Sequence, residues 1–281
     1  MKIAIASGKG GTGKSTLAIN VAYLLTRNKI SVCLKDCDVE EPNCHIFIRE
    51  GRSNIEKAEV AIPKIDNNLC VNCNKCVDLC AYNALAKVPG KVLVFSDLCH
   101  SCGGCTMICP VGAITEISKE IGLIKNKRTQ KLQLITGELK IGEAKSPPLI
   151  KKVKAYPVNS KLQIIDCPPG TACPAVSAIK DTDHVWLVTE PTPFGLHDLD
   201  LIVKVVRKLG ISHSIIINKS GYNDNIIETY AQQEAIPIIT RIPMDLKIIQ
   251  TYSAGGLIID ILPEYTSYFE PLINFVKEKI H

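Results

Sequence analysis

Long apolar runs and aromatic side chains are scarce in this chain of 281 residues. No apolar stretch reaches the roughly 18 residues that a membrane-spanning helix requires, so we do not expect a membrane protein. The first apolar stretch, residues 2–7, is too short for a secretory signal and runs directly into a glycine-rich loop. We therefore expect a buried first strand in a cytoplasmic protein.

Acidic residues are scarce between positions 119 and 161, where only Glu120, Glu138 and Glu143 occur. This segment is either a solvated face or a docking patch for an acidic redox partner or a phosphate-rich ligand. Tyr156 is its single aromatic residue, so we expect no stacking surface for nucleic acid. The basic residues of the segment are Lys119, Lys125, Lys127, Arg128, Lys131, Lys140, Lys145, Lys151, Lys152, Lys154 and Lys161.

Cysteines, by contrast, are abundant, and the missing secretory signal argues against disulfides. Most of them form two runs with the spacing C-x2-C-x2-C-x3-C. This spacing holds two [4Fe–4S] clusters, with the fourth cysteine of each run crossing to the other cluster. Zinc is the competing interpretation of C-x2-C pairs, but two tandem runs with the x3 ligand favour clusters. The two predicted ligand sets are Cys70, Cys73, Cys76 and Cys109, and Cys80, Cys99, Cys102 and Cys105.

The remaining cysteines are expected to be small buried hydrophobic residues. They are Cys33, Cys37, Cys44, Cys167 and Cys173. Cys37 and Cys167 are alternative candidates for oxidation sensors. Around the cysteine runs, the stretch 80–85 resembles the stretch 109–114, which suggests a pseudo-twofold module, although Ala81 stands where Pro110 follows the second run.

Outside this module, strand and helix patterns alternate along the chain. Residues 120–141 show extended polar–apolar alternation. Repeated strand–helix units require parallel strands covered on both faces, so we predict a doubly wound, mostly parallel α/β sheet with an inserted α+β ferredoxin-like module. The expected strands are 2–7, 31–36, 161–166, 183–189, 213–218 and 236–241, and the expected helices are 15–27, 195–209, 225–234, 244–252 and 264–280.

The glycine-rich loop has the form G-x4-G-K-S between a strand and a helix, which is the context of a phosphate-binding loop. Its backbone N–H groups form an anion nest at a helix N-terminus. Lys14 is expected to reach the β- and γ-phosphates of ATP, Ser15 to ligate Mg²⁺ and Thr16 to brace the α-phosphate. The loop consists of Gly8, Lys9, Gly10, Gly11, Thr12, Gly13, Lys14 and Ser15.

With its second lysine, Lys9, the loop resembles the deviant Walker A motif of the MinD/ParA/nitrogenase-iron-protein group of ATPases. Residues 36–43 resemble the first switch of that group, and residues 166–170 resemble its Walker B motif and second switch. Asn218 ends a later strand, where the group places an asparagine against the adenine. Cys173 follows the second switch, and by the same resemblance it is a candidate for the dimer interface.

The resemblance implies catalytic roles as well. Lys9 would reach the partner's phosphates across an ATP-dependent homodimer, and Asp38 would orient the attacking water. Asp36 and Asp166 would hold the Mg²⁺ shell. Phosphoryl transfer needs such positioned cations and a carboxylate near the water, so we expect slow, partner-stimulated ATP hydrolysis that involves Lys9, Lys14 and Asp38.

The combination resembles MinD-superfamily ATPases with an inserted dicluster ferredoxin domain. The expected domains are an ATPase domain at 1–60 and 118–281 and a ferredoxin-like domain at 61–117. The main functional hypothesis is an ATP-gated dimer that transfers electrons through two [4Fe–4S] clusters. The alternatives are an iron–sulfur cluster carrier of the Mrp/Nbp type, and a positioning ATPase with structural or redox-sensing clusters. The chain has no C-x-x-C pair after Cys173, which departs from the Mrp/Nbp pattern.

Overall fold

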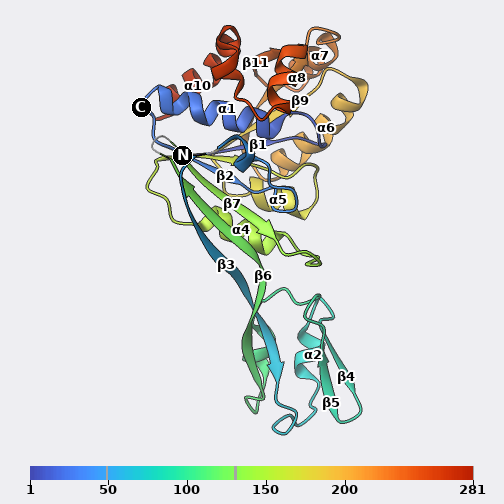
Figure 1. Ribbon diagram of the computed structural model, residues 1–281. Helices are drawn as coiled ribbons and strands as arrows, with labels where there is room; N and C mark the ends of the chain where they lie inside the picture. Colours follow the sequence, from blue (N-terminus) through green and yellow to red (C-terminus); the bar gives the residue numbers. More distant parts are fainter. Residues whose placement is uncertain (49, 130–131, 281) are drawn as a thin grey trace.

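The structure is a computed structural model that describes residues 1–48, 50–129 and 132–280. Within these residues, one nine-stranded sheet has the order β11-β10-β9-β1-β8-β2-β7-β6-β3, and a small second sheet pairs β4 with β5 (Figure 1). The strands are β1 Lys2–Ala6, β2 Val32–Asp36, β3 Arg52–Ile65, β4 Leu85–Val88, β5 Lys91–Val94, β6 Ile114–Arg128, β7 Gln133–Leu139, β8 Leu162–Asp166, β9 His184–Thr189, β10 Ser212–Ser220 and β11 Ile238–Pro243.

Helices cover both faces of the sheet. The α-helices are α1 Lys14–Arg27, α2 Lys75–Leu79, α3 Gly104–Ile108, α4 Pro147–Ala155, α5 Cys173–Ile179, α6 Pro193–Lys208, α7 Asn225–Gln233, α8 Leu246–Ser253, α9 Ile258–Ile261 and α10 Glu270–Ile280, and the 3-10 helices are η1 Cys44–Phe47 and η2 Pro263–Tyr268. Among the described residues, no helix combines the length and apolar character needed to cross a membrane.

The strands from β11 to β7 are parallel, and their side chains alternate between two cores. In β1, Ile3 and Ile5 pack with residues of α1 and α10, whereas Ala4 and Ala6 pack with residues of α4, α5 and α6. A strand that is buried on both faces is apolar throughout rather than alternating. The mostly parallel α/β sheet expected from the sequence is therefore confirmed.

A long two-stranded arm, formed by β3 and β6, extends from the main sheet. The two strands pair antiparallel from Arg52↔Arg128 next to the main sheet to Ile65↔Ile114 at the tip of the arm. At about 3.3 Å per residue, a strand of this length reaches roughly 45 Å. The arm carries residues 66–113, with α2, α3, β4 and β5, away from the main sheet (Figure 1). The domain boundaries that we predict near 61 and 117 fall within β3 and β6.

The prediction of one C-terminal helix over 264–280 is wrong in its extent. The structure divides it into η2 and α10 at Phe269. Pro271 explains the break, because proline has no N–H to donate and is tolerated only in the first turn of a helix. α10 therefore begins at Glu270, which places Pro271 in its first turn.

A buried histidine makes stability depend on pH. The His184 ring lies between the hydroxyls of Ser212 and Ser214, at 2.9 and 3.0 Å, and against Phe275. Burial lowers the pKa of His184 to about 4. The unfolded chain binds this proton near pH 6.5, so the stabilisation is complete above that pH and declines towards pH 4, by roughly 3 kcal/mol in all. Denaturant unfolding between pH 4 and 7 should show a shallower decline for His184→Gln, and equal slopes would refute this.

Candidate functional site

The phosphate-binding loop connects β1 to α1, and close contacts dictate its glycines. Gly13 has a φ of 89°, and a Cβ there would lie 2.3 Å from Asn218 Nδ2. A Cβ on Gly8 would lie 2.1 Å from the carbonyl oxygen of Asp198 in α6. Only glycine fits such a left-handed conformation and such close approaches without strain. The loop is therefore clamped between α6 and β10.

Inside the loop, Lys14 is buried and donates a hydrogen bond to Ser7 Oγ at 2.9 Å. Burial lowers the pKa of Lys14, and the nearby carboxylates of Asp166 and Asp38 oppose this. The buried Thr12 Oγ1 has no hydrogen-bond partner among the described residues. The buried ammonium of Lys14 and the unpartnered hydroxyl of Thr12, at the start of α1, fit an anion such as a nucleotide phosphate.

Two buried carboxylates face each other beside the loop. Asp36 ends β2 and Asp166 ends β8, and the two are register partners. Burial raises the pKa of Asp36, and the neighbouring Asp166 raises it further. Burial also raises the pKa of Asp166, against the opposing effects of the Ser15 hydroxyl and Lys14. Mg²⁺ prefers oxygen ligands, and the carboxylates of Asp36 and Asp166 together with the Ser15 hydroxyl supply them. These three residues therefore fit the ion.

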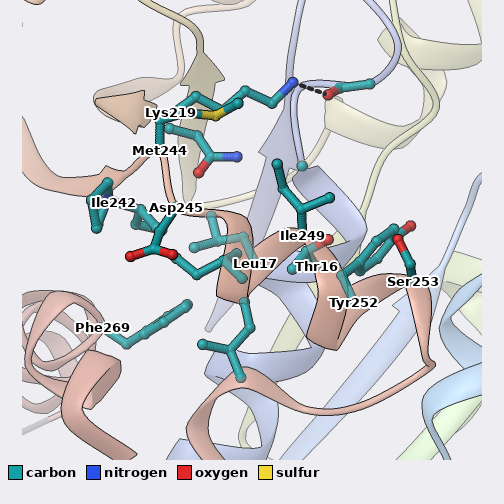
Figure 2. A pocket seen from close by; sticks show the side chains of 16 residues that line it. Thr16, Leu17, Lys219, Ile242, Met244, Asp245, Ile249, Tyr252, Ser253 and Phe269 are labelled. Atoms are coloured by element: carbon teal, nitrogen blue, oxygen red, sulfur yellow. Dashed lines mark hydrogen bonds between the residues drawn. The ribbon is translucent and has the colours of Figure 1, made fainter. Parts of the chain in front are cut away.

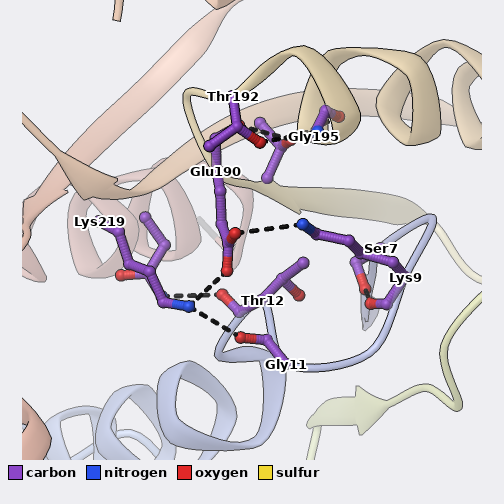
Figure 3. Close-up of polar contacts among 10 residues, drawn as sticks. Ser7, Lys9, Gly11, Thr12, Glu190, Thr192, Gly195 and Lys219 are labelled. Carbon is purple, nitrogen blue, oxygen red and sulfur yellow. Dashed lines mark hydrogen bonds and ion pairs between the residues drawn. The ribbon is translucent and has the colours of Figure 1, made fainter. Parts of the chain in front are cut away.

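The structure holds Lys9 within its own chain. Its Nζ lies 3.2 Å from Glu190 Oε2, and the Nζ of Lys219 lies 2.5 Å from Glu190 Oε1 (Figure 3). Burial raises the pKa of Glu190, but hydrogen bonds from Lys219 and Lys9 outweigh it and hold the pKa below its ordinary value. A Cβ on Gly195 would lie 2.1 Å from the Glu190 carbonyl oxygen, so α6 packs closely on this segment.

Sequence reasoning missed Glu190 and Lys219. The available signal was their position: Glu190 directly follows the predicted strand 183–189 and Lys219 directly follows the predicted strand 213–218, at the edge where the loop also lies. Their partnership depends on β1, β9 and β10 being neighbours in the sheet.

Releasing Lys9 should favour nucleotide-dependent association. In Glu190→Gln the neutral amide no longer attracts the Lys9 ammonium. Lys9 is then available to bind the phosphates of the nucleotide held by a second copy of the chain. We therefore expect dimers at a several-fold lower ATP concentration. Light scattering across an ATP titration measures this. Glu228→Gln, which removes the exposed pair with Arg241, is the matched control. Unchanged or weaker ATP-dependent association in Glu190→Gln would contradict the expectation.

A cavity of about 410 Å³ opens beside the loop (Figure 2). Asn218 lines it and donates from Nδ2 to the Thr12 carbonyl at 2.8 Å, while Lys219 donates to the Gly11 carbonyl at 3.2 Å. Its size and mostly apolar lining suit a nucleoside next to the phosphate site. Thr16 and Asn218 were predicted to bind the nucleotide, and the structure places both on this cavity. Further lining residues, which the sequence did not indicate, include Leu17, Ile242, Met244, Asp245, Ile249, Tyr252 and Phe269.

At the tip of the arm, the cysteines surround two small cavities. The structure places Cys70, Cys73, Cys76 and Cys109 around one, and Cys80, Cys99, Cys102 and Cys105 around the other, which Cys76 also borders. In each group, one cysteine comes from the other run. Four convergent thiols are the donor set of a [4Fe–4S] cluster, so the residues present fit the two predicted ligand sets.

The sequence repeat has a structural counterpart. α2 follows Asn74 and α3 follows Gly103, and both preceding residues have left-handed backbones. The N–H groups of Ala84 and Ala113 lie 3.3 Å from the sulfurs of Cys80 and Cys109, respectively. The two halves thus hold their fourth cysteines in the same way.

Several basic side chains of segment 119–161 are engaged within the chain. Lys119 pairs with Asp97 and Glu143, and Lys145 donates to the Cys99 carbonyl. Other internal pairs are Lys125 with Glu138, Lys127 with the Ile48 carbonyl, and Lys154 with the Ser177 and Lys180 carbonyls. Lys131 lies outside the described residues. A docking role for this segment stays a prediction.

The other cysteines divide into two kinds. The expectation of burial holds for Cys33, Cys37, Cys44 and Cys167. It is wrong for Cys173, which is exposed and is the first residue of α5.

Comparisons with known proteins identify the family of this chain. The model of the CobQ/CobB/MinD/ParA nucleotide binding domain matches residues 3–258. An uncharacterized protein of Methanocaldococcus jannaschii is 33% identical over 98% of this chain and 97% of its own length. An iron-sulfur cluster carrier protein of Pyrococcus horikoshii is 22% identical, over 99% of this chain and 87% of its own.

Among solved structures, the septum site-determining protein MinD of Pyrococcus horikoshii, complexed with Mg-ADP, has a similar fold. Its TM-score is 0.62 at 20% identity, and the match covers 98% of this chain and 95% of that one. The resemblance to MinD and ParA that the loop and switch motifs indicate is thereby confirmed. The chain belongs to the CobQ/CobB/MinD/ParA family of nucleotide-binding domains.

Proposed function

We propose that this protein is an ATPase that carries iron–sulfur clusters, and that its nucleotide state controls their release from residues 66–113. Relatives that match nearly the whole chain are named iron-sulfur cluster carriers, which favours this hypothesis over ATP-gated electron transfer. Hydrolysis would use Lys14 and Asp38 in an ATP-dependent homodimer. The clusters are then cargo, held by the two sets of four cysteines.

The observation that carries the proposal is the unequal exposure of the cysteines. Cys73 and Cys102, the second cysteine of each run, are exposed, whereas the other cluster cysteines are buried or half-buried. A thiolate from an acceptor protein can therefore approach each cavity and replace a ligand.

A continuous β path connects the nucleotide site to this cargo site. Asp36 in β2 pairs with Thr136 in β7, and the Leu139 N–H donates to the Val39 carbonyl at 2.8 Å. β7 pairs in turn with β6, which forms the arm. A shift of the segment around Val39 on nucleotide binding would therefore act directly on the arm.

Transfer to an acceptor tests the proposal. The reconstituted protein is mixed anaerobically with an apo-acceptor that requires a [4Fe–4S] cluster, with and without MgATP, and acceptor activity and residual iron are followed. We expect faster transfer with MgATP, accompanied by loss of iron from this chain, and no such acceleration in Lys14→Ala. Retention of all iron under both conditions would refute the carrier.

Electron transfer is the second candidate, and a specific feature favours it. Backbone N–H groups lie near the sulfurs of Cys80, Cys99 and Cys109, and such hydrogen bonds tune cluster potentials. In addition, the stacked rings of Tyr82 and His100 border one cysteine cavity. An ATP-dependent shift of the reduction potential without iron loss would support this candidate instead.

A further inference from the structure

A third ligand-type group stands beside the two carboxylates of the nucleotide site. Cys44, the first residue of η1, is fully buried. Its N–H donates to Asp36 Oδ2 at 3.0 Å, and its thiol donates to Asp166 Oδ2 at 3.4 Å. One ligand atom from each of the three residues lies within 4.8 Å of the other two. One ion can therefore reach all three.

An unsatisfied atom points to such an ion. Asp166 is buried, and its Oδ1 has no hydrogen-bond partner among the described residues. Buried acceptors are nearly always paired, and each exception calls for an explanation such as an ion. Asp36, buried opposite Asp166, adds a second carboxylate, whose oxygens accept hydrogen bonds from the Asp38 and Cys44 N–H groups.

We propose that Asp36, Cys44 and Asp166 form a site for a thiophilic divalent cation, with Zn²⁺ as its representative, in the nucleotide-free protein. Mg²⁺ is a hard ion that prefers oxygen ligands, whereas a thiolate favours Zn²⁺ or another borderline metal. On binding, the Cys44 thiol releases its proton to solvent, and its sulfur turns from Asp166 Oδ2 to the ion.

The site has a consequence for the nucleotide cycle. Asp36 and Asp166 are the residues expected to hold the Mg²⁺ shell, so Zn²⁺ and MgATP compete for them. A bound Zn²⁺ would also tie η1, and with it the segment after Asp38, to the end of β8. The site is independent of whether the protein carries clusters.

Zinc binding and zinc spectroscopy test the proposal on the full chain with its clusters in place. Equilibrium dialysis should give one zinc per chain without loss of iron. X-ray absorption at the zinc edge, which does not detect iron, should show one sulfur at about 2.3 Å with oxygens at about 2.0–2.2 Å. Cys44→Ser should lose the sulfur signal and bind zinc at least tenfold more weakly. Cys33→Ser, which alters a buried thiol in β2 away from both carboxylates, should bind zinc like the wild type.

Excess MgATP should release the zinc from the wild-type chain. Equal zinc affinity in Cys44→Ser, a signal from several sulfurs with loss of iron, or zinc retained in MgATP would each overturn the proposal. If Cys44→Ser does not fold, the wild-type spectrum decides: a single-sulfur signal that MgATP removes supports the site, and any other result contradicts it.

Discussion

Cys109→Ser should cost the protein the iron held by the first cysteine run, although Cys109 belongs to the second. The structure places Cys109 on the cavity of Cys70, Cys73 and Cys76, so its loss leaves that set with three thiolates. Since each [4Fe–4S] cluster needs four ligands, about half of the iron should be absent. Iron and sulfide analysis after anaerobic reconstitution measures the loss.

Paired variants make this result specific. Cys70→Ser should give the same cluster spectrum as Cys109→Ser, and the double variant should lose no more iron than either single one. Cys80→Ser should instead match Cys99→Ser. If Cys109→Ser behaved like Cys99→Ser, each run would hold its own cluster and the crossed ligand sets would be refuted.

Asp38→Asn should abolish most ATP hydrolysis while nucleotide binding persists. The amide cannot act as the carboxylate that positions the attacking water, and the loss of such a group costs on the order of 10²–10⁴-fold in rate. Glu40, an exposed carboxylate two residues further along, supplies the matched control in Glu40→Gln. Phosphate release should fall steeply in the first variant only, and binding of a fluorescent ATP analogue should be similar in both.

The carboxylate of Asp38 should also make the rate of ATP hydrolysis depend on pH. Burial, with a further contribution from Asp166, raises the pKa of Asp38 to about 6. Protonation below that pH removes the negative charge, so the rate of hydrolysis should fall as pH drops through 6 and level off above it. A hydrolysis rate that is constant from pH 5 to 8 would exclude this role for Asp38.

Much of the fold and site was accessible to sequence reasoning because its signals are local. The apolar strands predicted the parallel sheet, and the resemblance of the two switch segments to the MinD/ParA group implied that Asp36 and Asp166 lie together. The spacing of the cysteine runs likewise predicted which thiols share a cavity. In each case the residues that matter lie at fixed offsets from a strand or from one another.

What was missed depends on long-range pairing or on exposure. β3 escaped detection because most of its residues face solvent on both sides of the arm, so no alternation of polar and apolar residues marks it. Glu190 and Lys9 are 181 positions apart, and only the neighbouring placement of β1 and β9 joins them. In the sequence, Cys44 is indistinguishable from an ordinary buried cysteine. Only the folded structure, in which Cys44 belongs to η1, shows its contact with Asp166.

The rate at which an iron chelator removes iron from the reconstituted protein tests the central claim that nucleotide binding controls the cysteine sites. With a non-hydrolysable ATP analogue and Mg²⁺, the rate should change several-fold, because the β path from Asp36 through β7 and β6 reaches the arm. Lys14→Ala, which removes the phosphate-binding ammonium, should show no such change. Equal rates with and without the analogue in the wild-type chain would contradict the account.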